Sequence, residues 1–549
     1  MRILAVLTLI IALSGEALHS QELSTSVFPS EDELYQAYSL GEITFEQLIR
    51  LQEIAFVGVD STTPHLLDEI PNLSLLNLGL DTSGRSLESE QAALFSGSVS
   101  ARTGIERRLS GVLRHRYVRD LEEQSESKYQ TSVTLGFGDN LAADLRLQRE
   151  YSGNERLVGR GLTYRSTDGP VRDIRLGNFS RRLGLGTIVG YRGKLFDYSD
   201  QIDGESFLYP DYGGQNGLYS RLRAGVIEAQ SMVSVQRDSE FRLVTTAAMF
   251  SRASGSFQPG LIVAGNSLVN RTTGKDITDC KAGIHWQYRY AGGYNRSELN
   301  LQAGERKGPA GVVTEGRHRF RQADVRYALW SYSDDYLNLS GGGKAASLSS
   351  RQMLDAVEFN YSCKRAGQTG GLFKSLVDLT SSLKLSNSFL YAAIDSDTAD
   401  LQWLSGLIHT ASGWAVTLDH LRKTKRRVRD DRPNDSTSTR TRLELRTGQG
   451  LGRLRTYLAW NTRSRGKDFL TAFARFTREF AAYGRIELWG KVDRIEPSNF
   501  SPVYWYAYIK NEIYLLENVD LSIKLSHTYH GHYEDKHRTV VSLEMKVLL

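Results

Sequence analysis

Short segments in which apolar and polar residues alternate fill most of the chain after residue 105. Alternation with a period of two places apolar side chains on one face of a β-strand and polar side chains on the other. Residues 537–549, HRTVVSLEMKVLL, show this pattern to the last position. The segments are about ten residues long and are separated by turn residues or polar loops, so the sequence predicts a large β-structure.

A hairpin at residues 280–305 shows the pattern most clearly. Each of its strands has one apolar face and one polar or charged face, and Gly292 with Gly293 lies at the turn, where glycine tolerates a positive φ angle. The same alternation recurs in ADVRYALWSY, DAVEFNYSC, GRIELWGKVD and NVDLSIKLSHTY, with a further turn expected at Glu517 and Asn518. We therefore predict a succession of strands joined by turns.

The first hundred residues have a different character. Residues 1–20 combine an early arginine, an apolar run and small residues, which is typical of a secretory signal peptide. Residues 30–56 have helical periodicity and capping residues at the expected helix starts. The sequence thus predicts three parts: a signal peptide at 1–20, a helical periplasmic segment at 21–95 and a β-domain at 100–549.

Two architectures use many half-polar strands. A soluble β-sandwich or propeller buries its apolar faces, whereas a transmembrane barrel turns them to lipid and encloses a polar interior. Charged residues on the polar faces, aromatic residues near strand ends as in SPVYWYAYIK, and the export signal favour the barrel. We expect an all-β transmembrane antiparallel barrel of roughly 16 to 24 strands, even in number and preceded by a small α-helical segment. Its last strand then pairs with its first, so no edge stays open in lipid.

Composition restricts the picture further. The chain has 50 glycines and 27 tyrosines but only 10 prolines and 2 cysteines, a balance that favours strands and turns. Beyond the N-terminus, no stretch reaches the roughly 18 uninterrupted apolar residues of a membrane-spanning helix, which excludes a helical membrane protein. Cys280 and Cys363 both lie on apolar faces, where we expect two unpaired thiols; a disulfide between them is the alternative.

The polar faces supply candidates for the barrel interior. The first strands are rich in arginine, which would make a lumen attractive to anions; pairing with nearby acidic residues in a filled interior is the alternative. The lumen-facing candidates are Arg114, Arg116, Arg146, Lys281, His285, Gln287, Arg289, Glu298, Asn300 and Gln302.

A basic cluster stands apart from these candidates. It comprises Lys423, Lys425, Arg426, Arg427 and Arg429. We expect it in a solvated surface loop. Contact with lipopolysaccharide phosphates or with an anionic substrate is the alternative.

Two stretches resemble known families. The alternation at 537–549 resembles the C-terminal signal of bacterial outer-membrane barrel proteins, which the barrel-assembly machinery reads, although Leu549 stands where an aromatic residue is usual.

Residues 59–74, VDSTTPHLLDEIPNLS, resemble a helix-hairpin-helix segment. Asparagine replaces the usual hairpin glycine and is the next most tolerant of the left-handed conformation. The degenerate hairpin comprises Ile70, Pro71, Asn72 and Leu73.

The segments GVLRHRYVRDLEEQ and VRDIRLGNFSRRLGLGTIVGYRGKLF extend this likeness. Together with the hairpin they resemble exported proteins of Gram-negative bacteria that join a helix-hairpin-helix-like N-terminus to an outer-membrane barrel. The resemblance implies an outer-membrane location with the N-terminal segment in the periplasm. In soluble relatives the hairpin binds DNA phosphate, but Asp60, Asp68 and Glu69 would repel phosphate here, so nucleic acid is not an expected partner.

Clusters that point to chemistry are few. GLGTIVG, at 184–190, has the wrong spacing for a nucleotide-binding loop, and glycines at a strand bend explain it better. The acidic stretch DYSDQIDGE and the histidine group HTYHGHYEDKH, with His530 and His532, are alternatives for cation binding without a recognised ligand spacing. No GxSxG turn precedes the histidines, and no CxxC motif occurs. We expect no enzyme activity, no cofactor and no metal.

The function expected first is a channel or transporter for a polar or anionic solute. The alternative is a structural or assembly barrel with a filled lumen, whose helical segment binds a periplasmic protein. An outer-membrane enzyme is a distant third. The partners expected are outer-membrane lipid and lipopolysaccharide, the barrel-assembly machinery and, in the alternative, the periplasmic protein.

Overall fold

The computed structural model describes residues 109–548, apart from short gaps in the connections and the longer stretches 191–214, 341–345 and 348–363. The expected signal peptide, helical segment and degenerate hairpin, and the predicted strand DAVEFNYSC, lie outside the described residues. Among the described residues, no helix is long and apolar enough to cross a membrane.

Within the described part of the chain, 24 strands form a single sheet in which neighbouring strands run antiparallel. The first strands are β1 (Leu109–Asp120), β2 (Ser127–Phe137), β3 (Leu141–Arg149), β4 (Glu155–Arg165), β5 (Val171–Phe179), β6 (Gln215–Ala224), β7 (Ile227–Arg237), β8 (Phe241–Arg252), β9 (Phe257–Asn270), β10 (Asp276–Tyr290), β11 (Gly293–Ala303), β12 (Ala310–Arg319) and β13 (Ala323–Tyr332). The sheet continues with β16 (Thr369–Asp378), β17 (Leu383–Ala393), β18 (Ala399–Ala411), β19 (Trp414–Arg426), β22 (Ser436–Thr447), β23 (Arg453–Arg463), β24 (Phe469–Glu479), β25 (Gly484–Ile495), β26 (Pro502–Leu516), β27 (Val519–His530) and β28 (His537–Leu548). Two small pairs lie outside it: β14 (Ala346–Ser347) with β15 (Lys364–Arg365), and β20 (Val428–Arg429) with β21 (Arg432–Pro433).

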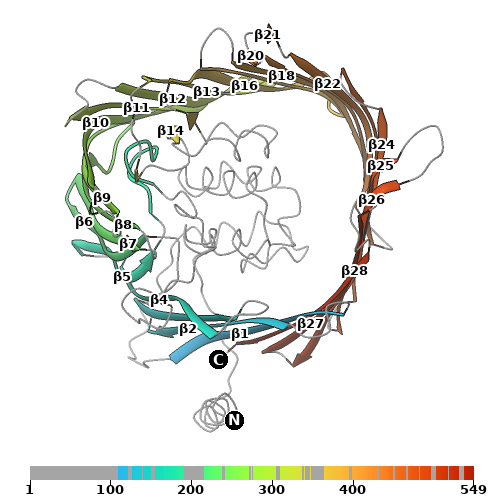
Figure 1. The fold of residues 1–549 in the computed structure, drawn as a ribbon, viewed down its shortest axis with the longest axis horizontal. Coiled ribbons are helices and arrows are strands. Elements are labelled where there is room, and N and C mark those ends of the chain that lie inside the picture. The colour runs from blue at the N-terminus through green and yellow to red at the C-terminus, as the bar shows by residue number, and fades with distance from the viewer. Residues whose placement is uncertain are drawn as a thin grey trace. The chain divides into compact units, whose positions relative to one another are not determined.

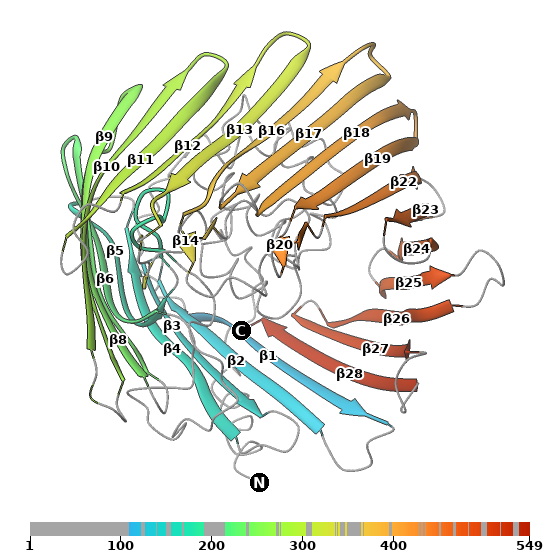
Figure 2. The ribbon, with the colours of Figure 1, turned by 45° about the horizontal axis from the view of Figure 1, so that its top comes forward.

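The sheet closes into a barrel because its last strand pairs with its first. The register of β1 with β28 runs from Val112 opposite Leu548 to Asp120 opposite Val540. Figures 1 and 2 show β28 beside β1 in the ring of strands. The predicted closure is confirmed, and the 24 strands of the described sheet are even in number and within the expected range.

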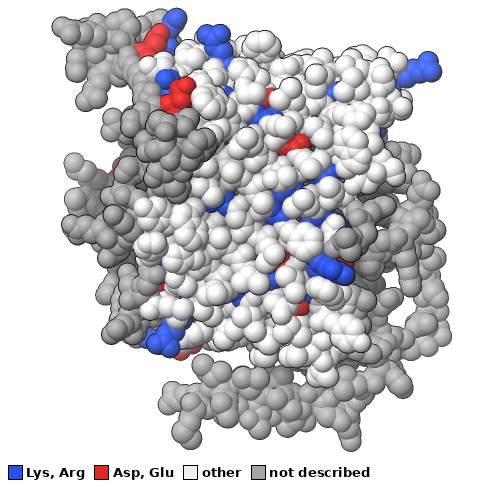
Figure 3. Space-filling model, turned by 90° about the vertical axis from the view of Figure 1, so that its right-hand side faces the viewer, with Lys and Arg blue, Asp and Glu red and all other residues white. Residues whose placement is uncertain are grey.

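The two faces of the barrel wall differ as a transmembrane barrel requires. Ile284 on β10 and Leu301 on β11 are 53% and 57% exposed, whereas Glu298 and Asn300, on the other face of β11, are fully buried. A soluble sheet would show the opposite distribution. Figure 3 shows the outer surface beside β24–β26 as mostly uncharged, with few lysine, arginine, aspartate and glutamate side chains. The fold is therefore an all-β transmembrane barrel.

The connections at the two ends of the barrel differ in length. At one end the connections are turns of a few residues, such as 225–226 and 412–413. At the other end lie the longest connections, residues 180–214 after β5 and 333–368 after β13. β1 begins and β28 finishes at the end with short turns. Bacterial barrels keep short turns on the periplasmic side and longer loops outside.

The turn of the 280–305 hairpin corrects one detail of the expectation. β10 ends at Tyr290 and β11 begins at Gly293, but neither Gly292 nor Gly293 has a positive φ angle. Gly293 is required for space instead, since an added Cβ would clash with the backbone oxygen of Arg317 on β12. The turn predicted between β26 and β27 is confirmed, because these strands end at Leu516 and begin at Val519.

Charge on the outer face provides a test of lipid contact. We expect Ile284→Arg, at the middle of β10, to lower the free energy of unfolding in lipid vesicles by about 2 to 4 kcal/mol, because the guanidinium would lie near the bilayer midplane. Tyr288→Arg, near the end of the same strand and on the same face, should cost about 0 to 1 kcal/mol. Chemical denaturation of the two refolded variants measures both values. Equal, negligible effects would mean that this face contacts water.

Candidate functional site in the barrel interior

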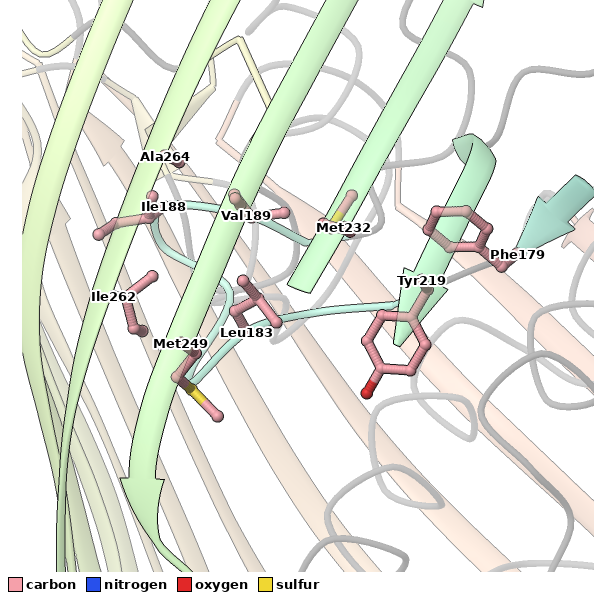
Figure 4. Close-up of a cluster of buried hydrophobic side chains, with 10 residues drawn as sticks. Phe179, Leu183, Ile188, Val189, Tyr219, Met232, Met249, Ile262 and Ala264 are labelled. Carbon is pink, nitrogen blue, oxygen red and sulfur yellow. The ribbon is translucent and has the colours of Figure 1, made fainter. Parts of the chain in front are cut away.

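The inner face of β6–β13 carries a hydrophobic core of its own. A loop after β5, residues 181–190, turns inward, and its side chains Leu183, Ile188 and Val189 are buried against strands β6–β9. Figure 4 shows these side chains facing Tyr219, Met232, Met249, Ile262 and Ala264, which come from successive strands of the wall. Burial of this apolar surface holds the loop on the wall.

The loop is fixed to the wall by a carboxylate. Glu298, on β11, accepts a hydrogen bond from the backbone N–H of Leu185 at 2.6 Å and a second from the hydroxyl of Thr187. Asn300, two residues further on the same face, also donates to the Thr187 hydroxyl. Because the carboxylate is fully buried, these bonds are shielded from competition by water.

Glycine makes this contact possible. Gly184 and Gly186 have φ angles of +59° and +79°, a region that other residues rarely adopt. An added Cβ at Gly184 would lie 2.5 Å from a carboxylate oxygen of Glu298 and 2.7 Å from Ile262. The glycine run 184–190 is therefore a loop docked on a carboxylate, and the expected strand bend is wrong. Its glycines serve backbone geometry, as predicted.

A second segment, from the connection after β13, holds the loop 181–190 through hydrogen bonds. The hydroxyl of Tyr336 donates to the carbonyl oxygen of Thr187 at 3.3 Å, and the Ser340 hydroxyl donates to that of Ile188 at 2.9 Å. The N–H of Gly190 returns a hydrogen bond to the Ser340 carbonyl at 2.9 Å. Burial raises the pKa of Tyr336 far above the usual range for tyrosine, so its hydroxyl remains a donor. We call residues 181–190 together with Tyr336 and Ser340 the inner staple.

Beneath the staple lies a buried ion pair. The ammonium group of Lys281 is 3.0 Å from a carboxylate oxygen of Asp279, both side chains are fully buried, and the ammonium lies 4.8 Å from the centre of the Tyr336 ring. Arg296 and Glu315 form a second buried pair on β11 and β12. The wall on this side is therefore filled, and both of these buried cations lie beside a carboxylate.

The opposite part of the inner wall is charged and less covered. On β19, β22 and β23, Arg442 donates from Nε to Asp419 at 2.7 Å. The single carboxylate of Glu444 accepts hydrogen bonds from Arg446 and Arg455 and forms an ion pair with Arg442. Further round the barrel, Arg475 pairs with Glu487 at 2.8 Å, and Glu512 pairs with Arg485 and Lys510 at 2.8 and 2.6 Å. This second half-wall has more cationic than anionic side chains.

Aromatic rings on the same face support these cations. Tyr457 and Phe473 stack with centroids 4.8 Å apart, and Phe473 meets Trp489 edge to face at 5.3 Å. Arg442 lies over Tyr457 at 5.6 Å and Arg455 over Phe473 at 5.7 Å. Such contacts fix a guanidinium by cation–π attraction while leaving its edge for hydrogen bonds.

The predicted lumen candidates fall into two groups. The buried group is Lys281, His285, Gln287, Glu298, Asn300 and Gln302. Arg289 is exposed at the end of β10, although it shares the polar face of His285 and Gln287. The structure brings Glu298, Asn300 and Lys281 together beneath the staple, whereas the ring nitrogens of His285 make no hydrogen bond within the described part of the chain.

Two of the early arginines have partners on β28, the strand that closes the barrel. Arg114 lies 3.4 Å from Glu544 of β28, and Arg116 donates to Ser542 of the same strand. Arg146 is half-buried on β3. Asp120, at the end of β1, accepts a hydrogen bond from Arg538 of β28 at 2.6 Å. Strand closure thus supplies partners that a local search of the sequence does not find.

The basic cluster is placed differently from the expectation. Lys423, Lys425 and Arg426 lie in β19 and not in a loop, because this strand remains paired with β18 and β22 to its last residues. Arg429 belongs to the short strand β20, and Arg427 lies outside the described residues. The degenerate hairpin, Ile70, Pro71, Asn72 and Leu73, also lies outside them.

The cysteine and cation-binding expectations are only partly covered by the structure. Cys280 is a free, exposed thiol on the apolar face of β10, and Cys363 lies outside the described residues. In the histidine group, the described contact is between His527 Nε2 and His537 Nδ1, at 3.1 Å. No group of three or more His, Cys, Asp or Glu side chains suited to a metal occurs among the residues that the structure describes.

Sequence reasoning missed the arginines of the second half-wall. Their signal is the run STSTRTRLELRT followed by GRLRTYLAW, in which arginine recurs at alternate positions. Thr187 and Tyr336 were also missed, and nothing local identifies them, since their partners lie on distant strands.

No family model and no curated protein matches the chain. Among solved structures, the chain is similar to the siderophore receptor PirA from Acinetobacter baumannii, at 8% identity, with 81% of each chain covered and a TM-score of 0.44. It is similar to PirA from Pseudomonas aeruginosa at 9% identity, covering 81% of this chain and 80% of that one, with a TM-score of 0.46. Pseudomonas aeruginosa OccK5 (OpdH) is similar at 12% identity over 59% of this chain and 96% of its own, with a TM-score of 0.32.

Proposed function

We propose that the chain is an outer-membrane barrel that passes a polar or anionic solute. The observation that carries this proposal is a closed ring of 24 described strands with an apolar outer face and a polar inner face. Barrels of 16 to 18 strands already leave an aqueous channel. A wider ring encloses more space than its own wall side chains fill.

The charge of the interior suggests the class of solute. On the second half-wall, Glu444 is shared by three arginines, and cationic side chains outnumber anionic ones. A passage lined by one sign of charge concentrates ions of the opposite sign. Anions are therefore the solutes that this interior favours.

The inner staple favours a second candidate. A barrel whose interior is occupied by its own segments serves as a scaffold, with residues 21–95 binding a periplasmic protein. The buried staple against β6–β13 is the observation that supports it. In either case we expect the outer face to contact lipid and lipopolysaccharide, the barrel-assembly machinery to insert the chain, and the short-turn end with the N-terminal segment to face the periplasm.

Single-channel recording in planar bilayers separates the candidates. We expect discrete conductance steps from the refolded chain, with anions carrying most of the current because of the cationic half-wall. The matched variant lacks residues 21–95. Steps in both forms support an open channel, and steps only after the deletion make that segment a plug. Silence in both would contradict the channel and favour the scaffold.

A further inference from the structure

The geometry points to an anion-binding site on the second half-wall, at a row formed by Arg446, Arg455 and Arg475, which we call the arginine row. This inference rests on the proposed function and names its solute class: a small organic anion with two or more carboxylate or phosphate groups. The three residues occupy directly opposed positions on β22, β23 and β24.

The three arginines of the row carry like charges in opposed positions, an arrangement that is unfavourable unless other groups compensate it. Arg446 faces Arg455 across one strand pair, and Arg455 faces Arg475 across the next. Like charges directly opposite each other destabilise a sheet. Two carboxylates, Glu444 and Glu487, offset part of this repulsion.

The compensation is incomplete. Glu444 accepts one hydrogen bond from Arg446 and two from Arg455, and it forms an ion pair with Arg442 at 3.3 Å, so its roughly four acceptor positions are largely occupied. The guanidinium groups of these three arginines face two carboxylates, those of Glu444 and Asp419. One positive charge is therefore in excess. Adding the Arg475–Glu487 pair leaves that excess unchanged.

The excess charge is accessible. The Arg446 side chain is 49% exposed, and the hydrogen bond that it donates to Glu444 uses its Nε. Arg455 is 27% exposed. Each guanidinium has five donors in a planar fork that matches a carboxylate or phosphate with two parallel bonds. Donors thus remain for an anion on the lumen side.

The row is also held in position. Arg455 lies over Phe473, which is stacked on Tyr457, and Arg442 lies over Tyr457. The stack continues to Trp489 on β25. Cations ordered in this way lose less freedom when an anion binds, which favours affinity. Arg446 stands one residue before the end of β22, so the row lies near the end of the barrel with short turns.

Calorimetric titration of citrate into the full refolded chain tests the site. We expect citrate to bind, and Arg446→Gln/Arg455→Gln to raise its Kd at least tenfold. Arg422→Gln, which removes an exposed arginine of β19 on the face opposite to Asp419, is the matched control and should leave the Kd unchanged. Arg446→Gln alone should raise the Kd several-fold, and it serves if the double variant fails to refold. Glucose, a neutral polar probe, should give no heat.

The outcomes separate this site from the proposed function. Calorimetry does not need an open pore, so citrate binding that depends on the row, with silent bilayers, would overturn the channel and retain the site. Conductance steps with equal citrate affinity in wild type and Arg446→Gln would retain the channel and overturn the site. Absence of citrate binding to the wild-type chain would also overturn it.

Discussion

Deletion of residues 537–548 should abolish assembly of the barrel. This stretch is β28, which pairs with β1 on one side and with β27 on the other. Without it, both neighbours present unpaired backbone groups to lipid, and each such group costs several kcal/mol. The expected result is complete loss of the compact, heat-modifiable form in gel electrophoresis after refolding into lipid vesicles.

The remaining strands have no simple way to close the ring. β1 and β27 are separated by one antiparallel strand, so they run in the same direction. Closing the sheet between them would require a parallel pair, with a different hydrogen-bond pattern and a new register. The loss of one strand therefore differs from the loss of a hairpin, which keeps the alternation of directions.

The control removes only Leu549. Every pair between β1 and β28 lies at or before Leu548, so this shorter deletion should refold in vesicles as the full chain does. Refolding in vitro needs no assembly machinery, which separates strand closure from a defect in a C-terminal recognition signal. A heat-modifiable species from the chain that lacks all of β28 would contradict the closure argument.

The strands could be predicted because they obey a local rule. The segment ADVRYALWSY is β13 from its first residue to its last, and the hairpin at 280–305 matches β10 and β11 to within a few residues. Alternation also told which face would be apolar, since the side chains of Lys281, His285 and Glu298 are buried while Ile284 is exposed. Alternation with a period of two is therefore enough to predict both the strands and which of their faces is apolar.

The candidate site could be predicted only in part, because its contacts are not local. Glu298 and Asn300 were assigned to the polar face, but their partner Thr187 is 111 and 113 residues away in the chain. The basic residues Lys423 to Arg426 were expected in a loop, since their charge suggested solvent. In a barrel the interior also receives charge, so polarity alone does not separate strand from loop here.

Loss of the Glu298 carboxylate should release the inner staple while the barrel stays folded. In Glu298→Ala, the N–H of Leu185 and the hydroxyl of Thr187 lose a buried acceptor. A buried donor without a partner costs about 1 to 3 kcal/mol, so the loop should lose about 2 to 6 kcal/mol of local stability. The strands pair through their backbone, so heat modifiability should not change.

Hydrogen exchange at the Leu185 amide is the measurement that follows most directly. We expect this amide to be protected in the wild-type chain and to exchange at least tenfold faster in Glu298→Ala. Thr187→Val should have a smaller effect, because it removes one of the two bonds and leaves the Leu185 N–H paired with Glu298. Leu299→Ala, on the outer face of the same strand, is the control and should leave the amide protected.

The same variant links the staple to passage through the barrel. If residues 181–190 narrow the lumen, their release in Glu298→Ala should increase the single-channel conductance relative to Leu299→Ala. Faster exchange at Leu185 with unchanged conductance would mean that the loop covers the wall without limiting the pore. Unchanged exchange would contradict the role of Glu298 itself. The loop would then be held in place by the apolar contacts of Leu183, Ile188 and Val189 with the wall.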